Sequence, residues 1–131
     1  MNTTKNYALL TCLVLILSRS GLSAESPFWP GWLGPNRDGW VKDVTPPEIW
    51  PEKLTQVWKI EVGTGYGTPL VQGDLVFTHT RQGDQEVMQC VDLKTGQTKW
   101  RQAFDMPFKI GGGGEYHGKG PKSNPILADG R

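Results

Sequence analysis

The chain has 131 residues, of which 17 are glycine and 10 are proline, and this length leaves room for one modest hydrophobic core. Its 14 basic and 13 acidic residues give a net charge of +1, without a basic run or stripe. This charge balance gives no support to nucleic-acid binding.

Residues 1–24 have the pattern of a signal peptide. Lys5 gives a positive start, residues 7–17 form a short apolar run, and small residues lead to a cleavage point after Ala24. The apolar run is too short to span a membrane, so we expect export to the periplasm or the exterior, with no membrane span after cleavage. An uncleaved N-terminal anchor is the alternative. Cleavage would remove Lys5 and Arg19, which reduces the basic residues from 14 to 12 against 13 acidic ones.

Cleavage would also remove Cys12, one of the two cysteines. Cys90 is then left without a partner for a disulfide within the chain, although the protein is exported. We predict that Cys90 is a buried structural thiol, and a reactive thiol is the alternative.

Residues 25–57 form an arm that is rich in tryptophan and proline. The four indoles of the arm belong to Trp29, Trp32, Trp40 and Trp50. Frequent prolines forbid a helix and predict an extended segment, with the clearest turn at residues 34–39. Because four indoles are too much apolar surface for a free linker, we expect them to pin the arm across a larger body. An aromatic platform that binds sugar is the alternative.

Short strands follow the arm. Residues 58–62 alternate between apolar and polar side chains, which predicts a half-buried strand. Four further strands, joined by tight turns, are predicted at residues 68–71, 75–80, 86–93 and 99–104. No stretch has helical periodicity with capping residues, so the sequence predicts an all-β fold.

The turn before the last of these strands has the most specific chemistry in the chain. Asp92 and Thr95 have side chains that can accept hydrogen bonds from the turn backbone, and Gly96 supplies the positive φ that the turn needs. Trp100 then presents a large flat surface that a single hairpin cannot bury. The pattern therefore predicts a neighbouring sheet.

Residues 90–100 resemble the repeat of the PQQ-like (pyrroloquinoline quinone repeat) β-propellers, which reads Ala-x-Asp-x-x-Thr-Gly-x-x-x-Trp. Asp92, Thr95, Gly96 and Trp100 are in register with it, and Cys90 replaces the alanine. The resemblance implies a propeller of four-stranded antiparallel blades, in which the tryptophan docks between adjacent blades. Residues 29–39 also resemble the entry segment of exported bacterial propellers of this type.

The resemblance suggests how the chain is divided. We expect residues 58–131 to be a partial propeller, with a closing strand at 58–62, a first blade at 68–104, a loop at 105–122 and the opening of a second blade at 123–131. Two pairs of similar segments support this division. Residues 68–71 resemble residues 124–127, and Trp58-Lys59 resembles Trp100-Arg101. Because a repeat array generally needs three or more units, we expect the isolated chain to be marginally folded.

Candidate ligand-binding residues lie on the face that the loops at 81–85 and 105–122 should share. We nominate Arg81, His117, Lys119 and Lys122 as the residues that would contact a ligand on this face, and a solvated mobile loop is the alternative. The glycines at 111–114 do not form a phosphate-binding loop, because the GxxxxGK[ST] pattern is absent. His79 and His117 have no metal-ligand spacing, so no metal site is predicted, and we interpret His79 as structural.

The functional expectation rests mainly on the family. We expect a noncatalytic binding or scaffold module of the cell envelope, similar to the BamB-like propellers, whose partner is an envelope protein or a small molecule rather than a nucleic acid. The alternative is a quinoprotein dehydrogenase that oxidises alcohols or sugars with pyrroloquinoline quinone and calcium. No catalytic base, calcium ligand or cofactor-binding residue can be assigned from the sequence, and the repeat motif names a fold more strongly than an activity.

Overall fold

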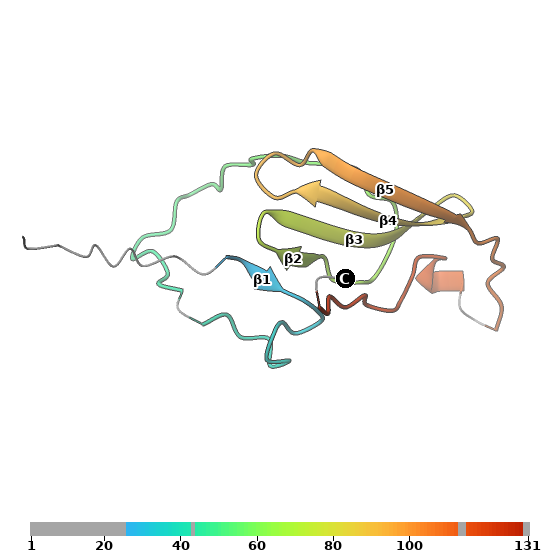
Figure 1. Cartoon of the computed structure of the whole chain (residues 1–131), viewed down its shortest axis with the longest axis horizontal. Coiled ribbons are helices and arrows are strands. Elements are labelled where there is room, and N and C mark those ends of the chain that lie inside the picture. Colours follow the sequence, from blue (N-terminus) through green and yellow to red (C-terminus); the bar gives the residue numbers. More distant parts are fainter. Residues whose placement is uncertain (1–25, 43, 113–114, 130–131) are drawn as a thin grey trace, which may run out of the picture.

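The computed structural model describes residues 26–42, 44–112 and 115–129. The predicted signal peptide, its cleavage point and Cys12 lie outside these residues. The described residues form one antiparallel sheet with loops around it (Figure 1).

The sheet has five strands that neighbour one another in chain order. They are β1 (Phe28–Trp29), β2 (Leu70–Gln72), β3 (Leu75–Gln82), β4 (Gln85–Asp92) and β5 (Thr98–Asp105). The described residues contain no α-helix and a single 3₁₀ turn, η1 (Glu115–His117). The predicted all-β class is confirmed, and so are the four consecutive strands after residue 68, which are β2 to β5.

Tight turns set the register of the central strands. Gly73 and Gly83 each begin a two-residue Gly-Asp turn with φ near +60°, a conformation that an L side chain rarely adopts. The second turn pairs β3 with β4 over eight residues, from Leu75 opposite Asp92 to Gln82 opposite Gln85. β3 is two residues longer than predicted, because Arg81 and Gln82 complete the backbone ladder, and β4 has the predicted length but begins and ends one residue earlier.

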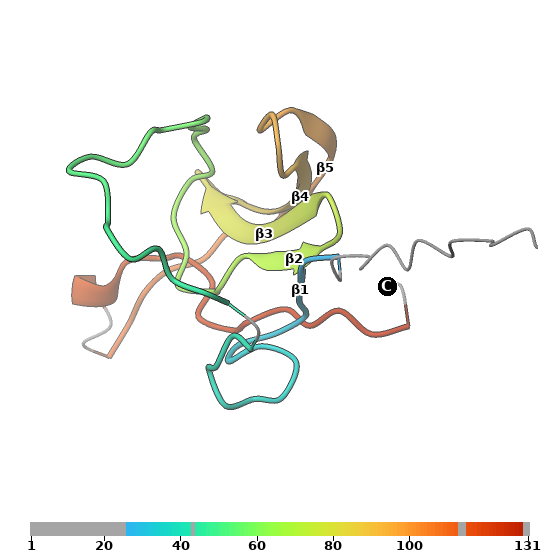
Figure 2. The same cartoon turned by 90° about the vertical axis from the view of Figure 1, so that its left-hand side faces the viewer.

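The two faces of the sheet differ in what covers them. On one face, Val76, Val87 and Val91 are buried and supply much of the small core. A segment that includes Trp58 and Val62 lies against this face of β3 (Figure 2): the Val62 carbonyl accepts hydrogen bonds from the Thr80 hydroxyl and, at 3.2 Å, from the Gln82 amide. The opposite face carries Phe77 of β3 and Trp100 of β5, which are both paired with Cys90 of β4.

The predicted strand at residues 58–62 is wrong in one respect. The side chains do alternate, with Trp58, Ile60 and Val62 partly buried and the residues between them exposed, but the segment joins no strand of the sheet. β4 pairs with all eight residues of β3, whereas β2 pairs only with Leu75 to Phe77. Only beyond the short β2 is an edge free, and there Thr64 forms an isolated bridge with Arg81.

The arm contributes a strand that the sequence analysis missed. β1 pairs with β2, with Phe28 opposite Gln72 and Trp29 opposite Val71. The predicted turn at 34–39 is present, and the Gly39 amide donates to the Leu33 carbonyl at 3.0 Å.

The expectation that four indoles pin the arm is wrong for three of them. Trp32, Trp40 and Trp50 are 64%, 73% and 66% exposed, whereas Trp29 is partly buried. The reason is one of area: a single five-stranded sheet offers too little surface to cover the whole arm.

The segment after the long loop returns to the arm. The Leu127 amide donates to the Pro30 carbonyl at 2.8 Å, and the Thr68 amide donates to the Asn124 side chain at 2.6 Å. The described residues 123–129 form no regular strand, so the expected opening of a second blade is not seen as a strand here. The two similar segments, 68–71 and 124–127, therefore lie next to each other.

Candidate functional site

The turn after β3 and the long loop after β5 meet at one end of the sheet, as predicted. The Met106 amide donates to the Asp84 carbonyl at 2.8 Å. At the other end, the Leu93 amide donates to the Asp74 carbonyl at 2.9 Å, and Lys94 forms an ion pair with Asp74 at 2.9 Å. Each end of the sheet is therefore built from two loops that the antiparallel order of the strands brings together.

Arg81 is the most unusual charged residue at the first end. Its side chain is only 3% exposed. Nη2 donates to the Met106 carbonyl at 2.5 Å and lies 3.5 Å from a carboxylate oxygen of Asp84, which is itself mostly exposed. Nε is buried and has no hydrogen-bond partner among the described residues. A buried guanidinium with an unused donor is costly, which makes it a candidate for contact with an anion.

A small pocket of about 150 Å³ lies beside Arg81. It is lined by Arg81, Glu86, Met106, Pro107, Phe108 and Lys119. Glu86 stands opposite Arg81 across the β3–β4 hairpin, and its carboxylate contacts His79 Nε2 at 3.1 Å. His79 therefore lies within a strand and pairs with a neighbour, in line with the structural role we expected for it.

The other three nominated residues lie in the adjoining part of the loop. His117 and Lys119 both line a more open pocket of about 460 Å³, whose lining consists of residues 63–66 and 116–120. The Tyr66 hydroxyl donates to the His117 carbonyl, and Lys122 Nζ lies 5.2 Å from the centre of the Tyr66 ring. Tyr66 therefore joins the two ends of this loop segment.

Among the residues that the structure describes, Lys119 alone lines both pockets. The structure thus brings Arg81 and Lys119 together in the small pocket, and His117 and Lys119 together in the open one. Lys122 lines neither of them and donates to the Gly118 carbonyl at 3.2 Å. Sequence reasoning missed Glu86 and Phe108. The hairpin register could have indicated Glu86, whereas no local signal points to Phe108.

The Asp92–Gly96 turn at the second end has the geometry that its sequence predicts. One carboxylate oxygen of Asp92 accepts hydrogen bonds from the Lys94 amide and from the amide and hydroxyl of Thr95, at 2.9 to 3.0 Å. The other oxygen contacts Lys99 at 3.1 Å. Gly96 has a φ of +72°. The hydrogen bonds from Lys99 and Thr95 hold the pKa of Asp92 at about 2.

Trp58 docks onto this turn. Its indole N–H donates to the Leu93 carbonyl at 2.8 Å, and a Cβ atom added to Gly96 would lie 2.8 Å from Cδ2 of the indole. The glycine therefore serves two purposes, because it adopts the left-handed conformation and leaves room for the ring.

The uncovered face of the sheet carries an apolar pocket of about 410 Å³. Phe77 and Trp100 form a tilted aromatic pair in it, with ring centres 6.1 Å apart, and Trp100 remains 45% exposed. The other lining residues are Leu70, Gln72, Leu75, Met88, Pro125, Ile126 and Leu127. Cys90 lies beneath this face, opposite Trp100, and burial raises the pKa of its thiol. Its side chain is buried and free, as predicted.

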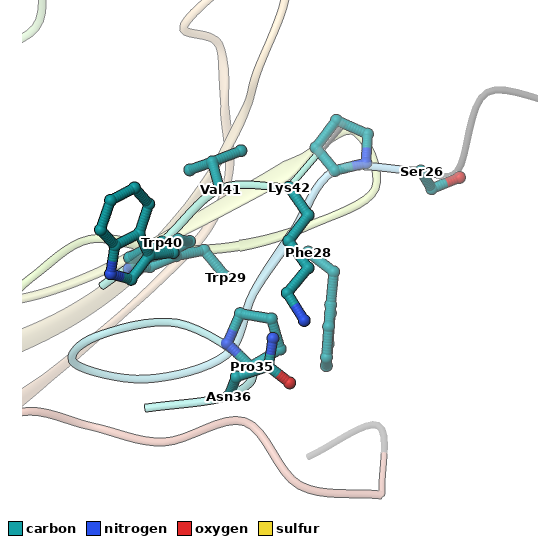
Figure 3. A pocket seen from close by; sticks show the side chains of 9 residues that line it. Ser26, Phe28, Trp29, Pro35, Asn36, Trp40, Val41 and Lys42 are labelled. Atoms are coloured by element: carbon teal, nitrogen blue, oxygen red, sulfur yellow. The ribbon is translucent and has the colours of Figure 1, made fainter. Parts of the chain in front are cut away.

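The arm forms a pocket of its own, of about 390 Å³, which Figure 3 shows from close by. Phe28, Trp29 and Trp40 supply its aromatic rings, and the side chain of Lys42 extends toward Asn36. Two of the four indoles of the sugar-platform alternative, Trp29 and Trp40, line this pocket, and Trp32 and Trp50 do not. The rings do not form one stacked surface in this view, since Trp40 is turned away from Lys42.

Two classes of feature are absent from the part of the chain that the structure describes. No three side chains among histidine, cysteine, aspartate and glutamate gather there in a way that could hold a metal ion. None of the helical segments there has the length and apolar character needed to cross a membrane.

Comparison of the chain with protein-family models, with curated proteins and with solved structures found no match.

Proposed function

We propose that strands β2 to β5 form one blade of a PQQ-like β-propeller, and that this exported propeller acts as a noncatalytic binding or scaffold module in the cell envelope. The repeat motif at residues 90–100 supports the family, and the four-stranded antiparallel meander is compatible with a blade. The composition of residues 1–24 supports export.

The observation that carries the proposal is the docking of Trp58 on the Leu93–Gly96 turn. Trp58 precedes strands β2 to β5 in the chain and packs on the turn between β4 and β5, as a tryptophan of one blade would pack on the next blade in the proposed propeller. Trp100 is the counterpart of Trp58 in the similar segments Trp58-Lys59 and Trp100-Arg101, and its ring is the exposed one. We infer that the Trp100 ring packs in the same way against a following sheet or a partner protein.

The apolar face around Trp100 supplies the binding surface. Its pocket joins two exposed hydrophobic side chains, Trp100 and Ile126, to the buried Leu70. Contiguous exposed apolar surface of this kind marks interaction sites, and a flat aromatic ring is a preferred anchor in them. An envelope protein with an apolar sheet face is the partner that fits this surface best.

The test uses the full-length exported protein with a tag, in matched variants. Cross-linking in intact cells should retain a partner protein with wild type and with Trp50→Ala, and should lose it with Trp100→Ala. Both substitutions remove an exposed indole, but only one lies on the apolar face. Identical cross-linking by all three proteins would contradict the proposal.

A titration separates this proposal from the dehydrogenase alternative. Calorimetry of the folded protein with pyrroloquinoline quinone, with and without calcium, should show no binding. Calcium-dependent binding would instead support the quinoprotein, and dye-linked oxidation of alcohols and sugars would then be the next assay.

A further inference from the structure

The pocket beside Arg81 combines a buried cation with an apolar wall. Arg81 has five N–H donors in principle, and its described protein partners are the Met106 carbonyl and the largely exposed carboxylate of Asp84, 3.5 Å away. The carboxylate that lines the pocket, Glu86, contacts His79 and forms no ion pair with Arg81. The buried guanidinium therefore has one ion pair, which is long and has an exposed carboxylate, and no carboxylate within the pocket pairs with it.

The unused donor is the Nε–H group, which is buried and unpaired among the described residues. An arginine presents its donors in a planar fork that matches the two oxygens of a carboxylate. Lys119 lines the same pocket and adds a second positive charge. Arg81 and Lys119 are the cations of the lining and Glu86 is its carboxylate, while Asp84, which pairs with Arg81, does not line the pocket. The lining itself therefore favours an anion.

The remaining wall is apolar and selects among anions. Met106, Pro107 and Phe108 line it, and none of them offers a side-chain hydrogen-bond donor. If an inorganic oxyanion were bound, this apolar wall would face water or the oxygens of the anion, and it would gain no apolar contact. A carboxylate with a short hydrocarbon tail would satisfy both parts of the lining.

The size of the pocket limits the ligand. Its volume is about 150 Å³, and a cavity of roughly this size in another protein holds benzene, a molecule with about six heavy atoms. Butyrate has the same number of heavy atoms. We propose that this pocket binds a short-chain monocarboxylate, with the carboxylate at Arg81 and Lys119 and the tail against Met106, Pro107 and Phe108. This site does not rest on the proposed scaffold function.

The test follows the side-chain Nε–H resonances of arginine in ¹H–¹⁵N NMR spectra of the chain. Sodium butyrate is added while sodium chloride is withdrawn, so that ionic strength stays constant. The Arg81 signal should shift and saturate, while the Arg101 signal stays in place, since Arg101 is exposed and already donates to Gln82 at 2.9 Å. Absence of a saturable shift at Arg81 would overturn the proposal.

The choice of ligand is tested in the same way. Butyramide, which has the tail without the charge, should produce no shift, and acetate should bind about fourfold more weakly for each methylene it lacks. Inorganic phosphate should bind more weakly than butyrate. Phosphate binding equal to or tighter than that of butyrate would show a general oxyanion site and overturn the assignment to a monocarboxylate.

Variants locate the site. Arg81→Lys keeps the charge but removes the fork, and should weaken butyrate binding by about tenfold or more. Lys119→Gln should weaken it, whereas the matched change Lys109→Gln in the same loop should not. Phe108→Ala should weaken butyrate binding more than acetate binding. If Arg81→Lys does not fold, the Lys119 and Phe108 variants decide the question, and unchanged butyrate affinity in both would overturn the proposal.

Discussion

The indole of Trp58 and the backbone carbonyl of Leu93, 35 residues apart in the chain, are joined by a 2.8 Å hydrogen bond. Through this bond the segment between β1 and β2 is attached to the Asp92–Gly96 turn. The turn itself is held by the Asp92 carboxylate, so one residue orders the turn and another caps it.

Removal of the Trp58 indole N–H should destabilise the fold. Trp58→Phe keeps an aromatic ring but leaves the Leu93 carbonyl without its partner, at a cost of about 1–2 kcal/mol. Urea unfolding followed by circular dichroism measures the change. The matched control is Trp50→Phe, because Trp50 is exposed and should change stability by less than about 0.5 kcal/mol. Equal effects of the two substitutions would contradict a specific role for Trp58.

Substitution of Gly96 by alanine should be more harmful than the same change at Gly73. Both glycines have positive φ, +72° and +59°, so each substitution costs about 1–2 kcal/mol in backbone strain. An added Cβ at Gly73 meets nothing within 4 Å, whereas at Gly96 it would overlap the Trp58 ring. Urea midpoints of the two variants isolate the steric part. Equal destabilisation would show that Trp58 does not rest on Gly96 in solution.

The stabilising contribution of Asp92 should depend on pH in a defined window. Its pKa in the folded protein is about 2, below the ordinary value of 3.8, because the folded state favours the charged carboxylate. The contribution is therefore fully present above about pH 4 and is lost as the pH falls toward 2. The difference in urea midpoint between wild type and Asp92→Asn should be large at pH 6 and shrink by pH 2.5. A difference that stays constant over this range would exclude the charged interaction as its source.

The Cys90 thiol should react slowly in the folded protein. It is 1% exposed, and burial raises its pKa, so little thiolate is available to a reagent. A Cys12→Ser variant leaves Cys90 as the sole thiol, and its reaction with a disulfide reagent should be at least tenfold slower in buffer than in urea, in keeping with the general dependence on exposure. Similar rates in both conditions would mean that the sheet opens readily around Cys90.

The strands and the Asp92–Gly96 turn could be predicted because their signals are local. Alternation, Gly-Asp turns and the side chains of Asp92 and Thr95 all act within a few residues of the backbone that they shape. β1 could not be predicted in this way. It has two residues, carries no periodic pattern, and exists only because β2 offers it an edge.

The same distinction applies to the candidate site. Arg81 was nominated from its place at a loop, and its burial follows from contacts with Met106 in a loop 25 residues later. Phe108 and Lys119 reach the pocket through a loop path that no local pattern encodes. The exposure of Trp32, Trp40 and Trp50 could not be predicted from the sequence either. Composition indicates how much apolar surface the arm has, but it does not indicate how much of the sheet is available to cover that surface.

The position of Trp58 also bears on the order in which the protein folds. The β3–β4 hairpin needs only a two-residue turn and can form within microseconds, with low loop-closure entropy. Trp58 has no acceptor or ring-sized space until the turn after β4 exists, and its contact spans 35 residues. We therefore expect the indole to dock late, so that substitutions at Trp58 accelerate unfolding and leave the folding rate nearly unchanged.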